Sequence, residues 1–182
     1  MAAGRRCQGD HAELRHITRL VAPLRYAGTG GALVRRFKLD ADPMAAAFLS
    51  RTLVEAWRAA ADAAWRHAVV VPVPLHPRRR RERGFDQAAW LAHELARRLR
   101  LEALPAALSR SRATLPQGDP RVLSRTGNVE GAFRLQQKQA VRNRRIVLVD
   151  DVFTSGATAR ACARLLRAAG AVEVAALVVC RS

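Results

Sequence analysis

The sequence predicts an α/β protein with a central, mostly parallel sheet and helices on both faces. Three apolar runs, at residues 68–74, 146–149 and 172–180, contain no charged residue beyond a single glutamate. Such runs are typical of strands that are buried on both faces of a parallel sheet. Residues 85–99 separate two of the runs and place apolar side chains every three to four positions, which predicts a helix. Strands that alternate with helices indicate a parallel α/β architecture.

Length and composition favour one globular domain. The chain has 182 residues, of which 49% are hydrophobic, enough for a full core. No stretch approaches the ~20 apolar residues of a membrane-spanning helix, and the first residues lack the apolar segment of a secretory signal. The three cysteines, Cys7, Cys162 and Cys180, are far apart and odd in number, which argues against a disulfide framework or a zinc site. We therefore expect a cytoplasmic protein without membrane insertion.

The charge is strongly positive. The formal net charge is +17, and nearly all basic residues are arginine. Such a charge raises affinity for polyanions, although the accompanying richness in Ala, Leu and Val also fits a compositional bias. Nucleic acids and phosphate-rich small molecules are both candidate partners. The basic runs lack interleaved aromatic residues, which weakens the case for a platform that stacks single-stranded bases.

The first third of the chain predicts short elements and one long helix. We expect a strand at residues 19–26, a turn at 28–31 and a short helix at 32–39. Asp42 followed by Pro43 is a typical helix start, with an acidic cap and a proline in the first turn. That helix is expected to run toward residue 66.

A basic loop is expected after the strand at residues 68–74. Residues 75–84 precede the helix at 85–99 and contain five arginines, namely Arg78, Arg79, Arg80, Arg81 and Arg83. Cations at the carboxyl end of a parallel strand suit a pyrophosphate group, and the planar guanidinium of arginine matches phosphate oxygens well. A solvated basic loop is the alternative.

A long polar segment follows. Residues 103–108 are expected to form a strand, and residues 109–131 a loop rich in Arg, Gly and Pro. A loop of this length in a compact domain is more often a lid or a binding segment than filler, with a surface loop as the alternative. Its polar candidates are Arg110, Arg112, Gln117, Arg125 and Asn128.

The most informative segment is residues 146–158. The apolar strand is expected to end at Asp150 and Asp151, where ligands of open α/β sheets lie. A loop rich in hydroxyls follows, and the helix expected at residues 157–169 would aim free N–H groups and its positive end at that loop. The acid pair suits vicinal hydroxyls and the loop suits a phosphate. Together they predict a site for a ligand such as a ribose 5-phosphate.

Two other interpretations of the acid pair are weaker. A Walker B element requires a G-x-x-x-x-G-K-[ST] partner, and neither lysine of the chain, Lys38 or Lys138, follows a glycine in that pattern. A purely structural turn would not need two adjacent carboxylates, which repel each other.

Residues 146–158 resemble the signature of type I phosphoribosyltransferases, which bind phosphoribosyl pyrophosphate (PRPP). The resemblance implies the type I phosphoribosyltransferase fold, with Asp150 and Asp151 as the residues that hold the ribose hydroxyls and Mg²⁺. It implies that the 5-phosphate lies in the loop made by Thr154, Ser155, Gly156, Ala157 and Thr158. The expected pyrophosphate site comprises Val73, Pro74, Leu75 and Arg83, with Lys38 as a further candidate.

Other segments resemble the ComF branch of competence proteins. They are Val71–His76 with Arg83–Ala88, the pattern Arg110-x-Arg112-x-Thr114-x-x-Gln117 with Arg125-x-x-Asn128-Val129-x-Gly131-Ala132-Phe133, and Tyr26 with Phe37-Lys38. This resemblance covers about residues 19–180. It divides the chain into an N-terminal remnant at 1–18, for which disorder is one interpretation, and a phosphoribosyltransferase-like domain at 19–182.

The chain departs from this branch at two places. Members usually begin with a cysteine-rich zinc ribbon, whereas only Cys7 stands near the start here, so we expect no bound zinc. Asp86 replaces the usual Asn. Aspartate keeps an acceptor but lacks the amide donor, and it adds a negative charge near the expected pyrophosphate.

The resemblance implies a PRPP-binding, phosphoribosyltransferase-like protein linked to DNA uptake in natural transformation. The implied reaction is displacement of pyrophosphate from C1 of ribose, with Mg²⁺ and arginines stabilising the departing charge. The alternative is a non-catalytic nucleic-acid-binding component of the DNA uptake machinery, whose PRPP site is vestigial or regulatory. The expected partners are therefore PRPP and, in the second case, single-stranded DNA or DNA-uptake proteins.

Overall fold

A parallel sheet forms the centre of the molecule. The computed structural model describes residues 14–111 and 131–182. The strand order is β1-β8-β7-β3-β4, β2 also pairs with β8, and every pair of this sheet is parallel. The predicted fold class is therefore confirmed. The strands are β1 (Arg19–Val21), β2 (Leu24–Arg25), β3 (Val69–Pro72), β4 (Glu102–Ala103), β7 (Arg145–Phe153) and β8 (Glu173–Arg181).

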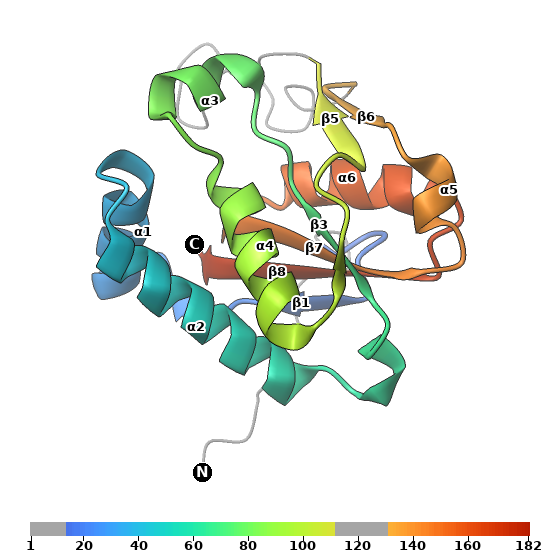
Figure 1. Cartoon of the computed structure of the whole chain (residues 1–182), viewed down its shortest axis with the longest axis horizontal. Coiled ribbons are helices and arrows are strands. Elements are labelled where there is room, and N and C mark those ends of the chain that lie inside the picture. The colour runs from blue at the N-terminus through green and yellow to red at the C-terminus, as the bar shows by residue number, and fades with distance from the viewer. Residues whose placement is uncertain (1–13, 112–130) are drawn as a thin grey trace.

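Helices cover both faces of this sheet (Figure 1). One face carries α1 (Thr29–Leu39), α2 (Pro43–Ala60) and α4 (Gln87–Leu99), and the other carries α6 (Ala157–Ala168). The side chains of β7 alternate between the two cores, since Ile146 and Leu148 pack toward α6 while Val147 and Val149 pack toward the other helices. This period of two is what a strand buried on both faces requires.

The basic segment at residues 75–84 is a helix and not the expected loop. Pro77 opens α3 (Pro77–Arg83), and the Nδ1 atom of His76 accepts a hydrogen bond from the Arg78 N–H at 3.2 Å. Gly84 ends the helix with a φ of 77°, the left-handed conformation that glycine adopts without strain. Proline at the start and glycine at the end set the bounds of this helix, although its sequence has no apolar periodicity.

The first elements also differ from their expected bounds. The strand expected at residues 19–26 is split into β1 and β2 by Pro23, which cannot donate a ladder hydrogen bond. The turn expected at 28–31 is shorter, because α1 already begins at Thr29. A Cβ atom at Gly31 would lie 2.0 Å from the carbonyl oxygen of Tyr26, so only glycine allows the helix to start this close to the preceding chain.

Two more elements end earlier than expected. Asp42 caps α2 as predicted, its Oδ1 accepting from the Met44 N–H at 2.8 Å, but α2 ends at Ala60 and a short 3₁₀ helix, η1 (Ala63–Trp65), follows. The strand expected at residues 103–108 is reduced to β4.

The stem of the long polar segment is a small antiparallel pair. In this second sheet β5 (Leu108–Arg110) pairs with β6 (Phe133–Leu135), and α5 (Lys138–Val141) leads from there to β7. Four polar candidates, Arg112, Gln117, Arg125 and Asn128, lie outside the described residues, as does Cys7. None of the helices in the described ranges has the length and apolar character needed to cross a bilayer.

Candidate active site at the carboxyl end of the sheet

The two aspartates lie where β3 leaves the sheet. The strand β7 does not end at Asp150 as expected but continues to Phe153, paired with β8. Its pairing with β3 stops at Val149, which lies opposite Pro72 and accepts a last hydrogen bond from the Val73 N–H at 2.8 Å. Asp150 and Asp151 therefore stand at the carboxyl edge of the central sheet, the usual position for a ligand.

Asp151 forms an ion pair with the end of α1. The Nζ atom of Lys38 lies 2.9 Å from Oδ1 of Asp151, and the two side chains are 20% and 14% exposed. Lys38, which is more than a hundred positions away in the sequence, thus neutralises one of the two carboxylates predicted to bind the ribose.

Asp150 lies near α6, since its charge acts on the thiol of Cys162 in that helix. Its Oδ1 accepts a hydrogen bond from the Asp151 N–H at 2.8 Å. Burial, and next the nearby carboxylate of Asp151, raise the pKa of Asp150 to about 7, although the positive charges of Lys38 and Arg110 act in the opposite direction. This carboxyl group therefore changes charge near neutral pH.

The loop after β7 forms an anion cup at the start of α6. Gly156 adopts a φ of 69°, and a Cβ atom there would lie 2.4 Å from Cζ of Phe153. The first turn of α6 contains no acidic residue, and the free N–H groups of a helix start favour a phosphate. The Oγ atom of Ser155 is buried and has no hydrogen-bond partner among the described residues, which suits a group that accepts a hydrogen bond from a ligand or donates one to it. The structure thus places Thr154–Thr158 directly beside the acid pair.

The residues predicted to bind pyrophosphate lie after β3 and at the end of α3. Val73 is buried and follows β3, while Pro74 and Leu75 are partly exposed as the chain turns toward α3. The guanidinium of Arg83 donates from Nη1 to Oε1 of Gln87 at 3.2 Å.

Gln87 joins this cationic helix to α1. Only 2% of Gln87 is exposed, and its Nε2 donates to the carbonyl oxygen of Lys38 at 3.5 Å. The fold therefore connects Arg83, Gln87, Lys38 and Asp151, which belong to three separate segments. Gln87 is a residue that the sequence-based site prediction missed; its only signal is a polar side chain on the apolar face of a helix.

Arg110 is a second residue at this site, which the sequence indicated only as a polar candidate of the long segment at residues 109–131. Burial, and next the charge of Arg79, lower the pKa of this guanidinium, whereas Asp150 is among the groups that raise it. The guanidinium carbon of Arg110 also lies 5.2 Å from the ring centre of Phe133. The β5–β6 pair thus brings a partly buried cation to the Asp150 side of the site.

Asp86 has a structural role that explains its carboxylate. Its Oδ1 accepts a hydrogen bond from the Ala89 N–H at 3.0 Å and so caps α4. A negative charge at a helix start is favourable, and the amide donor of an asparagine is not needed for this bond.

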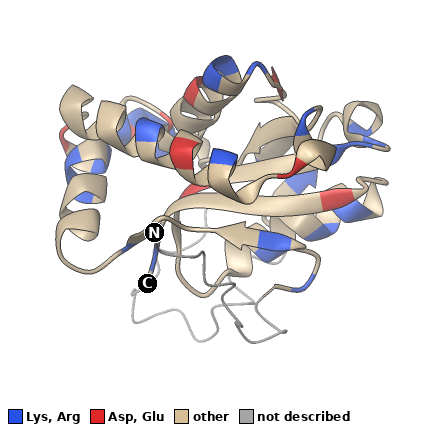
Figure 2. Cartoon of the chain, turned by 90° about the horizontal axis from the view of Figure 1, so that it is seen from below, with Lys and Arg blue, Asp and Glu red and all other residues tan. Residues whose placement is uncertain are grey.

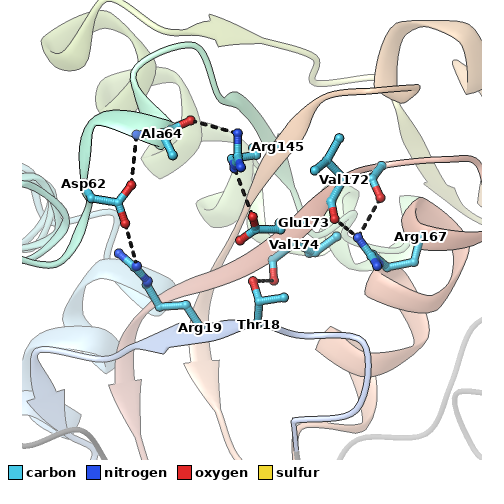
Figure 3. A network of polar contacts seen from close by, with 10 residues as sticks. Thr18, Arg19, Asp62, Ala64, Arg145, Arg167, Val172, Glu173 and Val174 are labelled. Atoms are coloured by element: carbon cyan, nitrogen blue, oxygen red, sulfur yellow. Dashed lines mark hydrogen bonds and ion pairs between the residues drawn. The ribbon is translucent and has the colours of Figure 1, made fainter.

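The opposite end of the sheet uses its arginines for structural contacts (Figure 3). Arg19 lies 3.1 Å from Asp62, and Arg145 lies 3.1 Å from Glu173. A hollow of about 390 Å³ opens beside Arg145. Because these cations already have acidic partners, the carboxyl end remains the better candidate site.

The acid pair supplies oxygen atoms of the kind that bind a magnesium ion. The described residues contain no cluster of three or more His, Cys, Asp or Glu side chains able to hold a metal. Mg²⁺, however, is usually bound by one or two carboxylates together with substrate phosphates and waters. Asp150 and Asp151 can supply such carboxylates.

Comparison with known proteins identifies the family and several relatives of this chain. Residues 86–182 match the model of the phosphoribosyl transferase domain family. The chain is 39% identical over 113 residues to the DNA utilization protein YhgH of Escherichia coli (strain K12). These aligned residues cover 62% of this chain and 49% of that protein. It is 34% identical over 148 residues to competence protein F of Haemophilus influenzae, with 78% and 63% covered. The chain thus spans about half the length of the first of these curated relatives.

One solved structure supports the fold alone. The allosteric regulatory enzyme of purine biosynthesis superposes with a TM-score of 0.50 at 19% identity, over 80% of this chain and 30% of that one.

Proposed function

The chain belongs to the phosphoribosyl transferase domain family, in its ComF-type branch, and on that premise we propose that it binds PRPP together with Mg²⁺. The observation that carries the proposal is the position of the acid pair directly beside the anion cup of α6, on one continuous segment. A ligand with vicinal hydroxyls and a 5-phosphate offers one group to the acid pair and the other to the cup.

Each part of the segment takes one part of the ligand. The carboxylates of Asp150 and Asp151 accept hydrogen bonds from the 2- and 3-hydroxyls of the ribose, and the Ser155 hydroxyl and the first N–H groups of α6 donate to the 5-phosphate. Gly156 keeps the loop open for the phosphate, because a side chain there would collide with Phe153.

The pyrophosphate lies on the side of α3 in this proposal. Arg83 and Lys38 contribute positive charge there, and the chain after Val73 leaves the sheet at the same place. Mg²⁺, when bound, would supply further positive charge to the departing pyrophosphate. The protein then accelerates displacement at C1 through orientation and charge stabilisation, without a covalent intermediate.

We further propose a link to DNA uptake, since the relatives are named for competence and DNA utilization. The second candidate function, nucleic-acid binding, is favoured by α3, where five arginines lie on a helix without a buried residue. Elsewhere in the described part of the chain, the Lys and Arg residues are spread over many elements (Figure 2). We place the protein in the cytoplasm, where the free thiols of Cys162 and Cys180 would remain reduced.

Calorimetric titration with PRPP and Mg²⁺ tests the main proposal. We expect the double variant Asp150→Asn/Asp151→Asn to lose binding and to keep the far-ultraviolet circular dichroism of the wild type. The control variant Asp40→Asn/Glu55→Gln removes two exposed carboxylates and should bind like the wild type. Equal affinities of the double variant and the wild type would remove the proposal.

The salt dependence of single-stranded DNA binding tests the second candidate. A steep dependence that is lost when Arg78–Arg81 are changed to Gln would support it. DNA affinity that does not change in that variant counts against it.

A further inference from the structure

The ion pair between Lys38 and Asp151 lies at the place that a divalent cation would need. The ammonium contacts Oδ1 of Asp151 at 2.9 Å, and both side chains are mostly buried. A magnesium ion that binds this carboxylate oxygen and an ammonium that contacts it cannot occupy the same position. Because two positive charges beside one oxygen repel each other, a metal that binds there disfavours the contact of the ammonium with the carboxylate.

The backbone of Lys38 is held in place, whereas its side chain is intrinsically flexible. The neighbouring Phe37 is buried and packs against Phe85 and Trp90, with ring centres 5.5 Å apart in each case. The carbonyl oxygen of Lys38 also accepts from buried Gln87 at 3.5 Å. The four-carbon stem of lysine can nevertheless shift its ammonium by several ångströms.

We propose that Lys38 is a displaceable counter-cation: it neutralises Asp151 in the empty site and moves to the polyphosphate of the ligand when a divalent cation takes its place. The inference rests on the PRPP site proposed above. Gln87 is a positioning residue, because its two hydrogen bonds join the backbone of Lys38 to the guanidinium of Arg83. Both cations then lie on the pyrophosphate side.

Opposite effects on metal and ligand distinguish this role from a purely structural one. Loss of the ammonium removes a competitor for the metal and also a contact to the polyphosphate. Lys38→Met should therefore bind Mn²⁺ alone more tightly, by about fivefold, the order expected for one partly screened ion pair. The same variant should bind PRPP with saturating Mg²⁺ about fivefold more weakly.

The experiment uses two measurements on the full chain. Electron paramagnetic resonance of free Mn²⁺, an ion that carboxylates bind as they bind Mg²⁺, reports metal affinity without PRPP, and calorimetry reports PRPP affinity. Lys138→Met is the matched control, because Lys138 is the other lysine of the chain, exposed at the start of α5 and far from α1 (Figure 1). It should match the wild type in both assays. Gln87→Met should change both affinities in the directions of Lys38→Met by a smaller factor, with circular dichroism as the check on folding.

The outcomes separate this inference from the proposed function. Wild-type Mn²⁺ affinity in Lys38→Met overturns the counter-cation role, and tighter Mn²⁺ binding with unchanged PRPP affinity overturns the transfer to the polyphosphate. If the wild type fails to bind PRPP while Lys38→Met still binds Mn²⁺ more tightly, the proposed function is refuted and the counter-cation role of Lys38 is supported.

Discussion

Replacement of Asp150 by asparagine should stabilise the protein, and the gain should increase with pH. In the folded state, burial and the Asp151 carboxylate raise the pKa of Asp150 from an ordinary 3.8 to about 7. At 1.36 kcal/mol for each pH unit, ionisation of this carboxyl group is disfavoured by folding by about 4 kcal/mol. Asparagine has nearly the same shape and carries no charge, so it avoids this cost.

The sign follows from proton binding. Because the pKa is higher in the folded than in the unfolded protein, the folded state holds more protons between pH 4 and pH 7, and the free energy of unfolding falls as pH rises through that interval. The loss of stability from this group reaches its full value once the pH exceeds the pKa of about 7 in the folded state. With these pKa values, the remaining fall between pH 5.5 and 8.5 is about 2 kcal/mol.

Urea unfolding of the wild type and Asp150→Asn at pH 5.5 and 8.5 measures this difference. The stabilisation by the substitution should be about 2 kcal/mol larger at pH 8.5 than at pH 5.5, with an unchanged dependence on urea. Asp40→Asn removes the same formal charge from an exposed position, and it reports the effect of overall charge alone on a chain of +17.

An equal gain at both pH values would refute the raised pKa of Asp150, and a loss of stability at pH 8.5 would refute the unfavourable burial of its charge. The expected result means that the chain keeps an ionisable group at a cost in stability. Such a cost is common where a residue serves binding and not folding.

Three further substitutions and one pH series test the site and its supports. Ser155→Ala should leave the free energy of unfolding unchanged or higher, since it removes a buried hydroxyl without a described partner, and should weaken PRPP binding about tenfold in calorimetry. Gly156→Ala should lower the free energy of unfolding by about 2 kcal/mol or more, from the positive φ and the contact with Phe153, as measured in urea. Gly31→Ala should cost a similar ~2 kcal/mol, because the added Cβ would meet the backbone and α1 would have to shift. PRPP affinity of the wild type should rise with pH up to about 7, as Asp150 loses its proton, and Asp150→Asn should lack this rise.

The strands and the long helices could be predicted because burial on both faces and helical periodicity leave direct marks in the sequence. The runs that became β3, β7 and β8 are almost purely apolar, and Asp42 with Pro43 marks the start of α2. In contrast, α3 has seven residues and no buried face, so no periodicity announces it. The extension of β7 past Asp150 depends on its pairing with β8, which no local pattern shows.

The acid pair and the phosphate loop could be predicted because they lie on one continuous segment. The pairing of Lys38 with Asp151, and the link from Lys38 through Gln87 to Arg83, join parts of the chain that only the fold brings together. The approach of Arg110 to Asp150 likewise depends on the β5–β6 pair. Contacts of this kind depend on the order of strands in the sheet, which the sequence alone did not specify.

A crystal structure of the chain with PRPP and Mg²⁺ tests the central claim most directly. The ribose hydroxyls should lie within hydrogen-bond distance of Asp150 and Asp151, the 5-phosphate should contact the Ser155 hydroxyl and the first N–H groups of α6, and the pyrophosphate should face Arg83. A phosphate bound in the hollow beside Arg145, or a 5-phosphate on α3 with the α6 cup empty, would contradict the account.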